Sequence, residues 1–347
     1  MSSLLSEISP VYMHRAIDLA LRSEGRAVAP NPRVGALLVC RGRVIGEGYH
    51  ERVGEGHAEV ECFKSIRDED RPLIGESILY VTLEPCAHEG RTPSCAKMLA
   101  REKVGAVVIG TLDPNPLVAG KGIEILRSAG IPVATGLLEE ECRRVAKVFL
   151  ANQERRRPFV LLKWAQSSDG YLDGLRTPGE PAARLSSGFT ALLVHRLRSS
   201  FAGILAGRRT YELDRPRLDN RLWRVSPFSP RRIMLTRGKV PEGILPLREV
   251  TEEALGELLG KEGITSLMVE GGAETLQSFI RAGLWDEIRV ETAPILLGGG
   301  VSAPALPPSA RTISRQTVSG HLITTLEPYG SEAPVSQVQD LEKLSFG

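Results

Sequence analysis

The most constraining feature of this sequence is a set of three potential metal ligands that lie in separate segments. His57 opens a His-x-Glu motif, Cys86 follows a proline, and Cys95 stands nine residues further on. One imidazole and two thiolates suit a tetrahedral zinc ion that keeps its fourth position open for water. A chain that binds zinc in this way must fold so that these three segments meet.

Glu59 lies two residues after His57 and need not be a ligand. Zinc lowers the pKa of a bound water toward neutrality, and a nearby carboxylate can pass the proton of that water to departing ammonia. This is the chemistry of zinc deaminases, whose signature is H-x-E…P-C-x-x-C. Here eight residues separate the cysteines instead of two, and this polar segment, residues 87–94, could contact substrate.

The local patterns around these residues predict how the three ligands can converge. Residues 57–66 and 94–102 have helical spacing, and Cys86 follows a predicted strand over residues 77–83. Since residues two apart on a helix point in different directions, His57 and Glu59 can face one metal only if His57 lies in the first turn or just before it. A helix N-terminus also favours the Cys95 thiolate.

Strand and helix patterns alternate along residues 1–152, which we take as the first domain. This alternation predicts an α/β sandwich with helices on both faces of one sheet. The expected strands are residues 34–39, 43–49, 77–83, 106–110 and 132–135, and the expected helices are residues 12–23, 57–66, 94–102, 121–129 and 139–152. Residues 154–158, which include three arginines, read as a solvated linker.

A second alternating series covers residues 158–330, and residues 331–347 form a polar C-terminal tail. The expected strands are residues 159–164, 202–206, 232–235, 266–269, 286–292 and 321–326, and the expected helices are residues 187–198, 252–259 and 273–282. Residues 269–272, Val-Glu-Gly-Gly, join a strand to a helix, where glycines let backbone N–H groups approach a phosphate. The sequence has no G-x-G-x-x-G fingerprint of a dinucleotide-binding Rossmann domain.

Composition argues against several classes of protein. With 44 basic and 42 acidic residues and only 5% aromatics, the chain is too balanced to bind nucleic acid mainly through phosphates. No apolar run approaches the roughly 18 residues of a membrane span, and the N-terminus lacks a secretory pattern. We therefore expect a cytoplasmic protein with no nucleic-acid or membrane partner. The odd count of five cysteines argues against a disulfide scaffold.

Further motifs accompany the zinc ligands in chain order: Pro-Asn-Pro at 30–32, His88, Gly-Arg-Thr-Pro at 90–93 and Asp-Pro-Asn-Pro at 113–116. Together they resemble the bifunctional riboflavin biosynthesis deaminase/reductase family, in which the long cysteine spacing is typical. The resemblance covers nearly the whole chain. It implies a cytidine-deaminase-like α/β/α sandwich followed by a dihydrofolate-reductase-like α/β domain.

The resemblance also implies two reactions on one small molecule. With one zinc ion per chain, the first domain would deaminate 2,5-diamino-6-ribosylamino-4(3H)-pyrimidinone 5′-phosphate. With NADPH, the second would reduce the ribosyl group to ribityl, giving 5-amino-6-ribitylamino-2,4-pyrimidinedione 5′-phosphate. By this likeness Glu59 is the proton shuttle, zinc is held by His57, Cys86 and Cys95, and the pyrimidine or its phosphate chain is contacted by Asn31, His50, His88 and Asn115.

In the second domain the resemblance implies separate contacts for substrate and cofactor. Substrate would be held by Arg198, Leu218, Arg221 and Glu270, with the arginines suited to its phosphate. NADPH would be held by Ala165, Thr210, Asp214, Gly272, Ala273, Glu274, Thr275, Leu276, Gln277 and Ser278. We also expect a homo-oligomer formed through this domain.

The second domain departs from the family pattern, which leaves alternatives open. Arg215, residues 182–184 and Arg237 stand where the family commonly has other residues. The reductase domain could therefore be degenerate, which leaves a deaminase only, or it could serve only for assembly. Alternatively, Arg237 binds the 2′-phosphate of NADPH, since a cation near that group commonly selects this cofactor. A nucleic-acid-editing protein on the deaminase fold is a further hypothesis.

Overall fold

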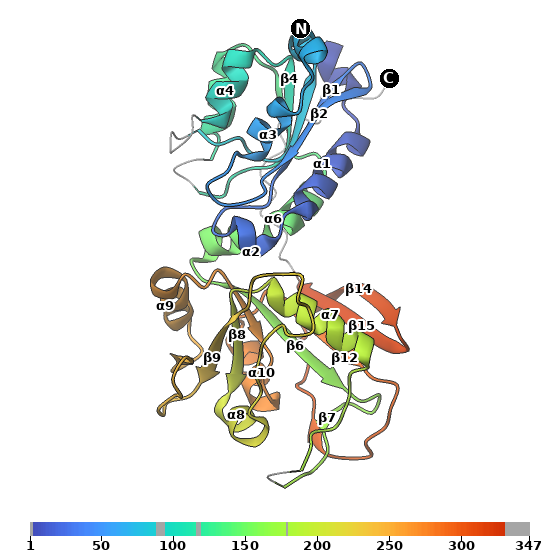
Figure 1. Cartoon of the computed structure of the whole chain (residues 1–347), viewed down its shortest axis with the longest axis vertical. Helices are drawn as coiled ribbons and strands as arrows, with labels where there is room; N and C mark the ends of the chain where they lie inside the picture. Colours follow the sequence, from blue (N-terminus) through green and yellow to red (C-terminus); the bar gives the residue numbers. More distant parts are fainter. Residues whose placement is uncertain (1–2, 88–93, 116–118, 178–179, 330–347) are drawn as a thin grey trace. The chain divides into compact units, whose positions relative to one another are not determined.

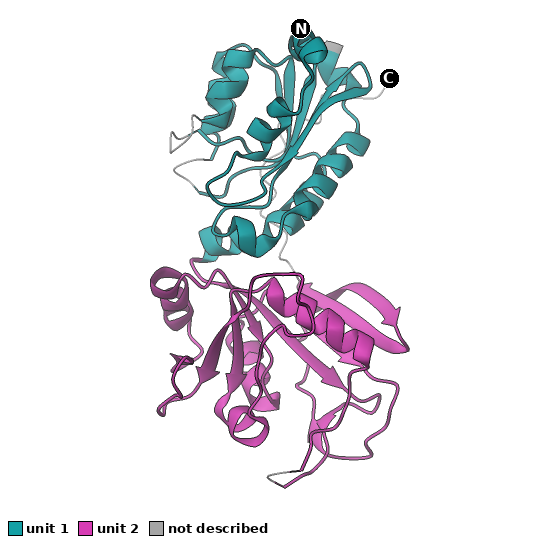
Figure 2. Ribbon diagram, viewed as in Figure 1, with its two compact units in different colours: residues 1–155, 334–347 teal, residues 156–333 magenta. Residues whose placement is uncertain are grey.

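The computed structural model describes residues 3–87, 94–115, 119–177 and 180–329, and these form two compact units. The first unit ends at Arg155 and the second begins at Arg156 (Figure 2). Each unit is built around its own sheet and its own hydrophobic core (Figure 1).

The first unit contains a five-stranded sheet in the order β2-β1-β3-β4-β5. Strand β1 is antiparallel to both of its neighbours, whereas β3, β4 and β5 are parallel. The strands are β1 (Gly35–Cys40), β2 (Arg43–Tyr49), β3 (Ile78–Leu83), β4 (Ala106–Thr111) and β5 (Val133–Thr135). Every residue of β1, β3 and β4 is buried, which is expected of strands covered on both faces.

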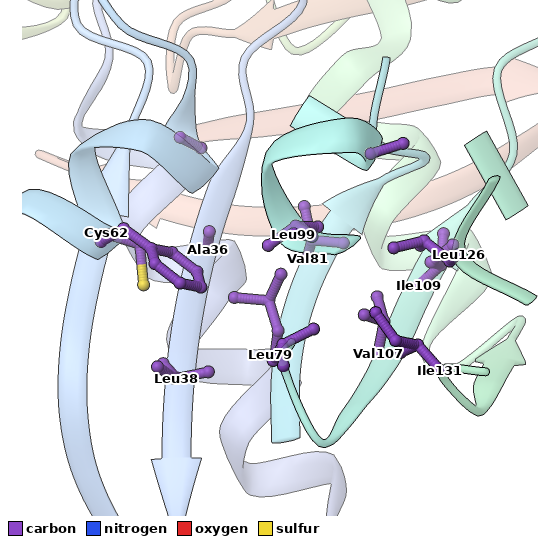
Figure 3. Packing of buried hydrophobic residues seen from close by; sticks show 14 of the residues in the cluster. Ala36, Leu38, Cys62, Leu79, Val81, Leu99, Val107, Ile109, Leu126 and Ile131 are labelled. Atoms are coloured by element: carbon purple, nitrogen blue, oxygen red, sulfur yellow. The ribbon is translucent and has the colours of Figure 1, made fainter. Parts of the chain in front are cut away.

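Helices cover both faces of this sheet because successive strand residues point to opposite sides. Ala36 and Leu38 pack under one helical layer (Figure 3), and Leu37 and Val39 pack under the other. The first layer consists of α3 (Ala58–Lys64), α4 (Cys95–Glu102) and α5 (Lys121–Ser128), and the second of α1 (Pro10–Arg22) and α6 (Glu139–Arg155). The predicted α/β/α sandwich is confirmed. Three short helical segments complete the unit: η1 (Ser3–Glu7), α2 (Gly25–Val28) and η2 (Asp68–Glu76).

Strand β2 approaches helix α3 closely at Gly48. A Cβ atom at this position would lie 2.2 Å from the backbone nitrogen of Cys62 and 2.5 Å from the carbonyl oxygen of Ala58. Only glycine fits such a contact, since real Cβ atoms do not approach backbone atoms so closely. The absence of a side chain at Gly48 therefore lets α3, the helix that carries Glu59, lie directly against β2.

The second unit contains an eight-stranded sheet in the order β10-β9-β8-β11-β6-β12-β15-β14. The first six strands in this order are parallel, and β15 and β14 are antiparallel. The strands are β6 (Phe159–Gln166), β8 (Gly203–Gly207), β9 (Arg231–Leu235), β10 (Leu245–Leu247), β11 (Ser266–Val269), β12 (Glu287–Thr292), β14 (Ala310–Val318) and β15 (His321–Pro328), and a separate pair joins β7 (Tyr171–Asp173) to β13 (Val301–Ser302).

Four helices accompany the second sheet: α7 (Gly188–Ser199), α8 (Arg208–Asp214), α9 (Glu252–Glu262) and α10 (Ala273–Ala282). The sequence patterns predicted α10 and β11 with their observed bounds. Five elements of this unit were not predicted, namely α8, β7, β10, β13 and β14. Four of these elements have seven residues or fewer, and β14 has no buried residue, so none of the five shows a clear apolar periodicity.

The arginine run before the second unit corrects one prediction. Residues 154–156 are exposed, as expected of a linker, but the interpretation is wrong for Arg157, which is 4% exposed. Its guanidinium donates to both carboxylate oxygens of Asp286, at 2.7 and 2.9 Å. Asp286 also accepts a hydrogen bond from the backbone N–H of Val160 at 2.7 Å, so the pair fastens the start of β6 to the start of β12.

Substitution of Arg157 by methionine is expected to destabilise the second unit strongly. It would leave the Asp286 carboxylate, also 95% buried, without its cation, and breaking such a pair commonly costs about 3–5 kcal/mol. The matched control is Arg231→Met, which breaks an exposed pair with Glu262 and should change the free energy of unfolding by about 1 kcal/mol or less. Denaturant titration measures both values, and equal effects of the two substitutions would contradict this prediction.

Candidate active sites

The three predicted metal ligands converge in the first unit. The Nδ1 atom of His57 lies 3.5 Å from the Sγ atom of Cys86 and 3.4 Å from that of Cys95. All three ligand atoms lie within 4.8 Å of one another. A tetrahedral zinc ion, with bonds of about 2.3 Å to sulfur and 2.0 Å to nitrogen, separates its ligands by roughly 3.5 Å. The donor set and its spacing therefore fit zinc.

Two helix starts bring the ligands together, as the sequence predicted. His57 is the N-cap residue of α3, just before the first turn. Cys95 is the first residue of α4, and its backbone N–H donates to the sulfur of Cys86 at 3.3 Å. Ser94 caps α4: its hydroxyl accepts from the N–H of Lys97 and donates to the carbonyl oxygen of Cys86 at 2.7 Å. This serine thus ties the two cysteine segments together.

The two sulfur atoms influence each other's protonation. The thiol of Cys95 lowers the pKa of Cys86 to about 4, and His57 acts in the same direction. The same contact with Cys86, together with burial, raises the pKa of Cys95. Cys86 is therefore the first of the two to be a thiolate, which is the form that binds metals.

Glu59 lies beside this site and is 3% exposed. Burial raises the pKa of Glu59 to about 7, and the neighbouring Cys86 contributes to the increase. A carboxyl group whose pKa lies close to neutrality can both accept and release a proton during turnover. The position and environment of Glu59 are those expected of a proton shuttle.

Two of the four predicted substrate contacts lie together next to the zinc ligands. The rings of His50 and His57 are 5.5 Å apart. His50 is buried, and its Nδ1 donates to the carbonyl oxygen of Gly56 at 2.9 Å, so its Nε2 can accept from the amide of Asn31 at 3.2 Å. Both ring nitrogens are thus engaged, and His50 orients the Asn31 side chain. Burial also lowers the pKa of His50, which favours this neutral form.

The other two predicted contacts, His88 and Asn115, come after β3 and β4 in the sequence. His88 lies outside the described residues. Asn115 is half-buried, and its backbone N–H donates to the Asp113 carboxylate at 2.9 Å. Sequence reasoning missed Glu84, which accepts three backbone hydrogen bonds around this loop. Its signal was available, since a buried strand that is apolar except for Thr82 is seldom followed directly by a glutamate.

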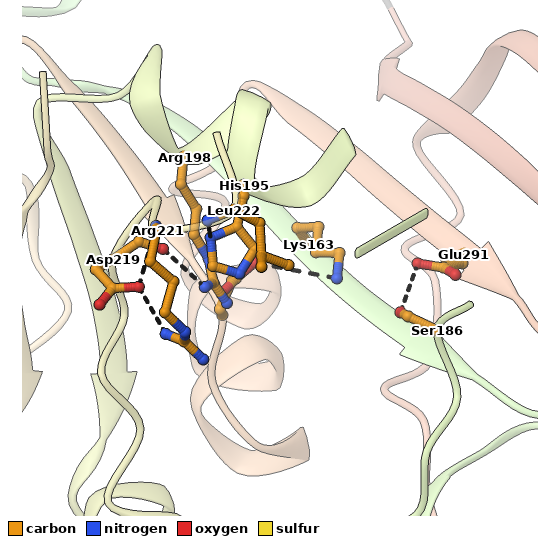
Figure 4. A network of polar contacts seen from close by, with 9 residues as sticks. Lys163, Ser186, His195, Arg198, Asp219, Arg221, Leu222 and Glu291 are labelled. Carbon is orange, nitrogen blue, oxygen red and sulfur yellow. Dashed lines mark hydrogen bonds and ion pairs between the residues drawn. The ribbon is translucent and has the colours of Figure 1, made fainter. Parts of the chain in front are cut away.

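In the second unit, the predicted substrate residues form one polar network (Figure 4). The Arg198 guanidinium donates to the carboxylate of Glu270 through Nε (3.0 Å) and Nη2 (2.5 Å), and through Nη1 to the carbonyl oxygen of Asp219 (3.0 Å). Arg221 pairs with the Asp219 carboxylate at 2.6 Å, and its side chain is 48% exposed. Leu218 is buried against Ile204 and Ala206 of β8 and directly precedes Asp219 in the chain.

Lys163 is a candidate functional residue that the predicted site omitted. It lies in the apolar strand β6, and its Nζ is 4.0 Å from a Glu270 oxygen that has no other partner among the described residues. Burial lowers the pKa of Lys163, and the nearby Glu270 and Glu291 oppose this effect. A lysine inside an otherwise apolar strand is the signal that could have revealed it.

The predicted cofactor segment lies at the start of α10. Gly272 is its N-cap, and a Cβ atom there would lie 3.5 Å from the Thr210 hydroxyl on α8. Thr275 and Leu276 are buried, and the backbone N–H of Leu276 donates to the carbonyl oxygen of Gly272 at 3.2 Å, so the free N–H groups of α10 are those of residues 272–275. Asp214 pairs with Arg176 at 2.5 Å. Ala165 is the next-to-last residue of strand β6 and is half-buried. Of the predicted cofactor residues, Ser278 lines a cavity.

This cavity of about 520 Å³ is lined by arginines from three segments. Arg237 follows β9, Arg248 follows β10, and Arg281 lies on α10 one turn beyond Ser278. Arg248 donates to the Thr236 carbonyl oxygen at 3.2 Å. Among the residues that the structure describes, Arg237 and Arg281 have no ion-pair partner, although the Glu249 side chain also lines the cavity.

Comparisons with known proteins agree with both units. The family model described as "Cytidine and deoxycytidylate deaminase zinc-binding region" matches residues 7–111, and that of the "RibD C-terminal domain" matches residues 158–313. Riboflavin biosynthesis protein RibD of Aquifex aeolicus is 37% identical over 86% of this chain and 90% of its own length. That of Bacillus amyloliquefaciens is 37% identical over 85% and 86%.

Solved structures agree as well. Acinetobacter baumannii RibD superposes with a TM-score of 0.80 at 30% identity, over 92% of this chain and 98% of that one. A diaminohydroxyphosphoribosylaminopyrimidine deaminase/5-amino-6-(5-phosphoribosylamino)uracil reductase from Thermotoga maritima gives 0.79 at 30% identity, with the same coverage.

The fold and the sites define a two-domain enzyme that joins a zinc-binding deaminase unit to a reductase unit that uses NADPH. The chain belongs to the RibD family of riboflavin biosynthesis proteins, and it combines both activities. The predictions of fold class, zinc and NADPH are confirmed, and nothing favours a degenerate reductase domain. Across the described residues, no helix is both long and apolar enough to cross a membrane.

Proposed function

We propose that the chain carries out two successive steps on one pyrimidine ribosyl phosphate. The first removes the 2-amino group of 2,5-diamino-6-ribosylamino-4(3H)-pyrimidinone 5′-phosphate, and the second reduces its ribosyl group to ribityl. The convergence of His57, Cys86 and Cys95 beside Glu59 carries this proposal. The Thermotoga maritima relative, whose title describes both of these activities, supports it.

In the first step, we assign zinc binding to His57, Cys86 and Cys95. When bound, the zinc ion activates water for hydrolysis. Glu59 takes a proton from the water whose oxygen bonds to the ring carbon, and it returns a proton to the nitrogen as the carbon–nitrogen bond breaks and ammonia leaves. Asn31, oriented by His50, and Asn115 hold the substrate, together with His88.

In the second step, bound NADPH would supply the hydride that reduces the open-chain imine carbon of the sugar, and the imine nitrogen takes up a proton from water. We assign the substrate phosphate to Arg221, the more exposed of the two arginines, and the sugar to Glu270, which Arg198 orients. Leu218 borders the substrate. Residues 272–278 of α10 bind the cofactor phosphates through the free backbone N–H groups of the first turn, with Thr210 and Asp214 beside them, and Ala165 lies on the nicotinamide side.

We assign the arginine-lined cavity to the 2′-phosphate of NADPH. It adjoins the proposed cofactor residue Ser278, and its two unpaired guanidinium groups suit a doubly charged anion. This assignment accounts for Arg237, which departs from the family pattern.

Arg237→Ser is expected to weaken NADPH binding about tenfold or more and to leave NADH binding unchanged. The reason is that only NADPH carries the phosphate, and a charge-assisted hydrogen bond contributes about 1.5–3 kcal/mol. Fluorescence titration with both cofactors measures the two affinities. Arg144→Ser, at an exposed position of α6 in the first unit, is the matched control. An equal loss for NADPH and NADH would contradict the assignment.

We further propose that the enzyme is a cytoplasmic homo-oligomer assembled through its second unit. The edge strand β14 presents unpaired backbone groups and the exposed side chain of Ile313, which supports a sheet-edge contact between copies. Five unpaired cysteines, two of them zinc ligands, suit a reducing compartment. Light scattering of the full chain measures the number of copies.

The function is tested by incubation with the diaminopyrimidine ribosyl phosphate, with and without NADPH, followed by mass spectrometry. Without NADPH, replacement of NH by oxygen should raise the product mass by about one unit. With NADPH, addition of two hydrogens should raise it by about two more. An unchanged mass in both samples would refute the proposal.

A further inference from the structure

The carboxylate of Glu84 is buried between the zinc-site segment and the loop that carries Asn115. Glu84 is 5% exposed and follows β3 directly, two residues before Cys86. Its backbone N–H donates to the carbonyl oxygen of Thr111 at the end of β4, at 2.9 Å. The side chain therefore lies where β3 and β4 end side by side.

Both carboxylate oxygens accept hydrogen bonds from the backbone around this loop. Oε2 accepts from the N–H groups of Asp113 at 3.3 Å and Gly120 at 3.1 Å, and Oε1 accepts from Gly122 at 3.1 Å. Gly120 is the N-cap of α5 and has no capping side chain of its own. Glu84 thus fixes the loop at both ends and supplies the cap that α5 lacks.

The loop is also packed directly against the zinc-site segment. A Cβ atom at Gly122 would lie 2.2 Å from the carbonyl oxygen of Pro85, so the start of α5 touches the residue that precedes Cys86. Within the loop, the Asp113 carboxylate accepts the N–H of Asn115 at 2.9 Å. A continuous chain of contacts therefore runs from Glu84 through Asp113 to Asn115.

We propose that Glu84 is a positioning residue for deamination: it holds the Asn115 loop against the Cys86 segment and so sets the affinity for the pyrimidine substrate. This inference rests on the proposed role of Asn115. A carboxylate is needed because three N–H donors converge on its two oxygens. Residues 113–115, which Glu84 already holds in place, need not be ordered when substrate binds, so the loss of Glu84 moves that entropic cost into binding.

Glu84→Gln tests this proposal with little change in volume. Whichever way it turns, the amide points its NH₂ group at one or more backbone N–H donors. We expect the KM of deamination to rise about tenfold or more, with kcat changed by less than about threefold. Zinc should stay at one per chain, and the reductase activity of the same molecules should be unchanged. Glu124→Gln, exposed on α5, is the matched control and should leave both constants unchanged.

A second variant disturbs the same loop without touching the carboxylate. Gly120 has a φ of +80°, which disfavours any side chain, and no atom lies within 4 Å of the position of a Cβ there. Gly120→Ala should therefore raise KM in the same selective way. A double variant of Glu84→Gln with Asn115→Ala should bind substrate no more weakly than Asn115→Ala alone. The reason is that both substitutions act on the same contact, that of Asn115 with the substrate.

The proposal would be overturned by an unchanged KM in Glu84→Gln, by a joint loss of kcat and zinc in that variant, or by additive effects in the double variant. Each differs from failure of the proposed function, in which the unmodified enzyme itself would release no ammonia from the pyrimidine. If Asn115→Ala alone has a normal KM, the assignment of that residue fails and the inference fails with it.

Discussion

Glu59→Gln is expected to leave zinc bound while it removes most of the deaminase activity. Glutamine has nearly the volume of glutamate, so the buried site beside His57 keeps its packing. An amide cannot accept the proton of the attacking water, however, and a positioned proton shuttle commonly contributes about 10²–10⁴-fold to the rate. The reduction in kcat should fall in that range.

The internal control for this variant is the second unit of the same chain. Ammonia release measures deamination, metal analysis gives the zinc content, and NADPH oxidation on the deaminated intermediate measures reduction. The last two quantities should match those of the unmodified enzyme, since Glu59 belongs to the first unit. Normal ammonia release by Glu59→Gln would end the assignment of the proton shuttle.

The regular elements of this fold were predictable because their patterns are local. Strand β1 is an unbroken apolar run, and α10 has apolar residues at helical spacing between a glycine on either side. Such segments specify their structure through their own burial. Strand β14 does not, since its register is determined by pairing with β15 and its residues are largely exposed.

The candidate sites divide in the same way. The zinc ligands could be predicted because the metal requires particular side chains, and a His-x-Glu motif with Pro-Cys is rare enough to recognise. The roles of Glu84 and Arg157 could not, because their partners lie 29–38 and 129 residues away in the sequence. A local pattern can mark such a charge as unusual, but it does not identify the distant partners of that charge, so only the fold reveals the two roles.

Cys95→Ala is expected to have the largest effect on deamination, because it removes a zinc ligand rather than a proton shuttle. Two protein ligands would remain, fewer than the three or four of stable zinc sites. We expect purified protein with far less than one zinc per chain and a rate below that of Glu59→Gln. NADPH oxidation on the deaminated intermediate should persist, since no predicted zinc ligand lies in the second unit.

Cys62→Ala is the matched control for this substitution, since it removes an equally buried thiol from α3, the helix that carries Glu59. Cys62 packs in the core beneath that helix and is not one of the three converging ligands, so its variant should keep one zinc per chain and most of the deaminase activity. Comparison of the two variants separates loss of metal from loss of packing. If Cys95→Ala retained stoichiometric zinc and normal ammonia release, or if both variants lost zinc equally, the metal centre would not be the one that these three side chains define.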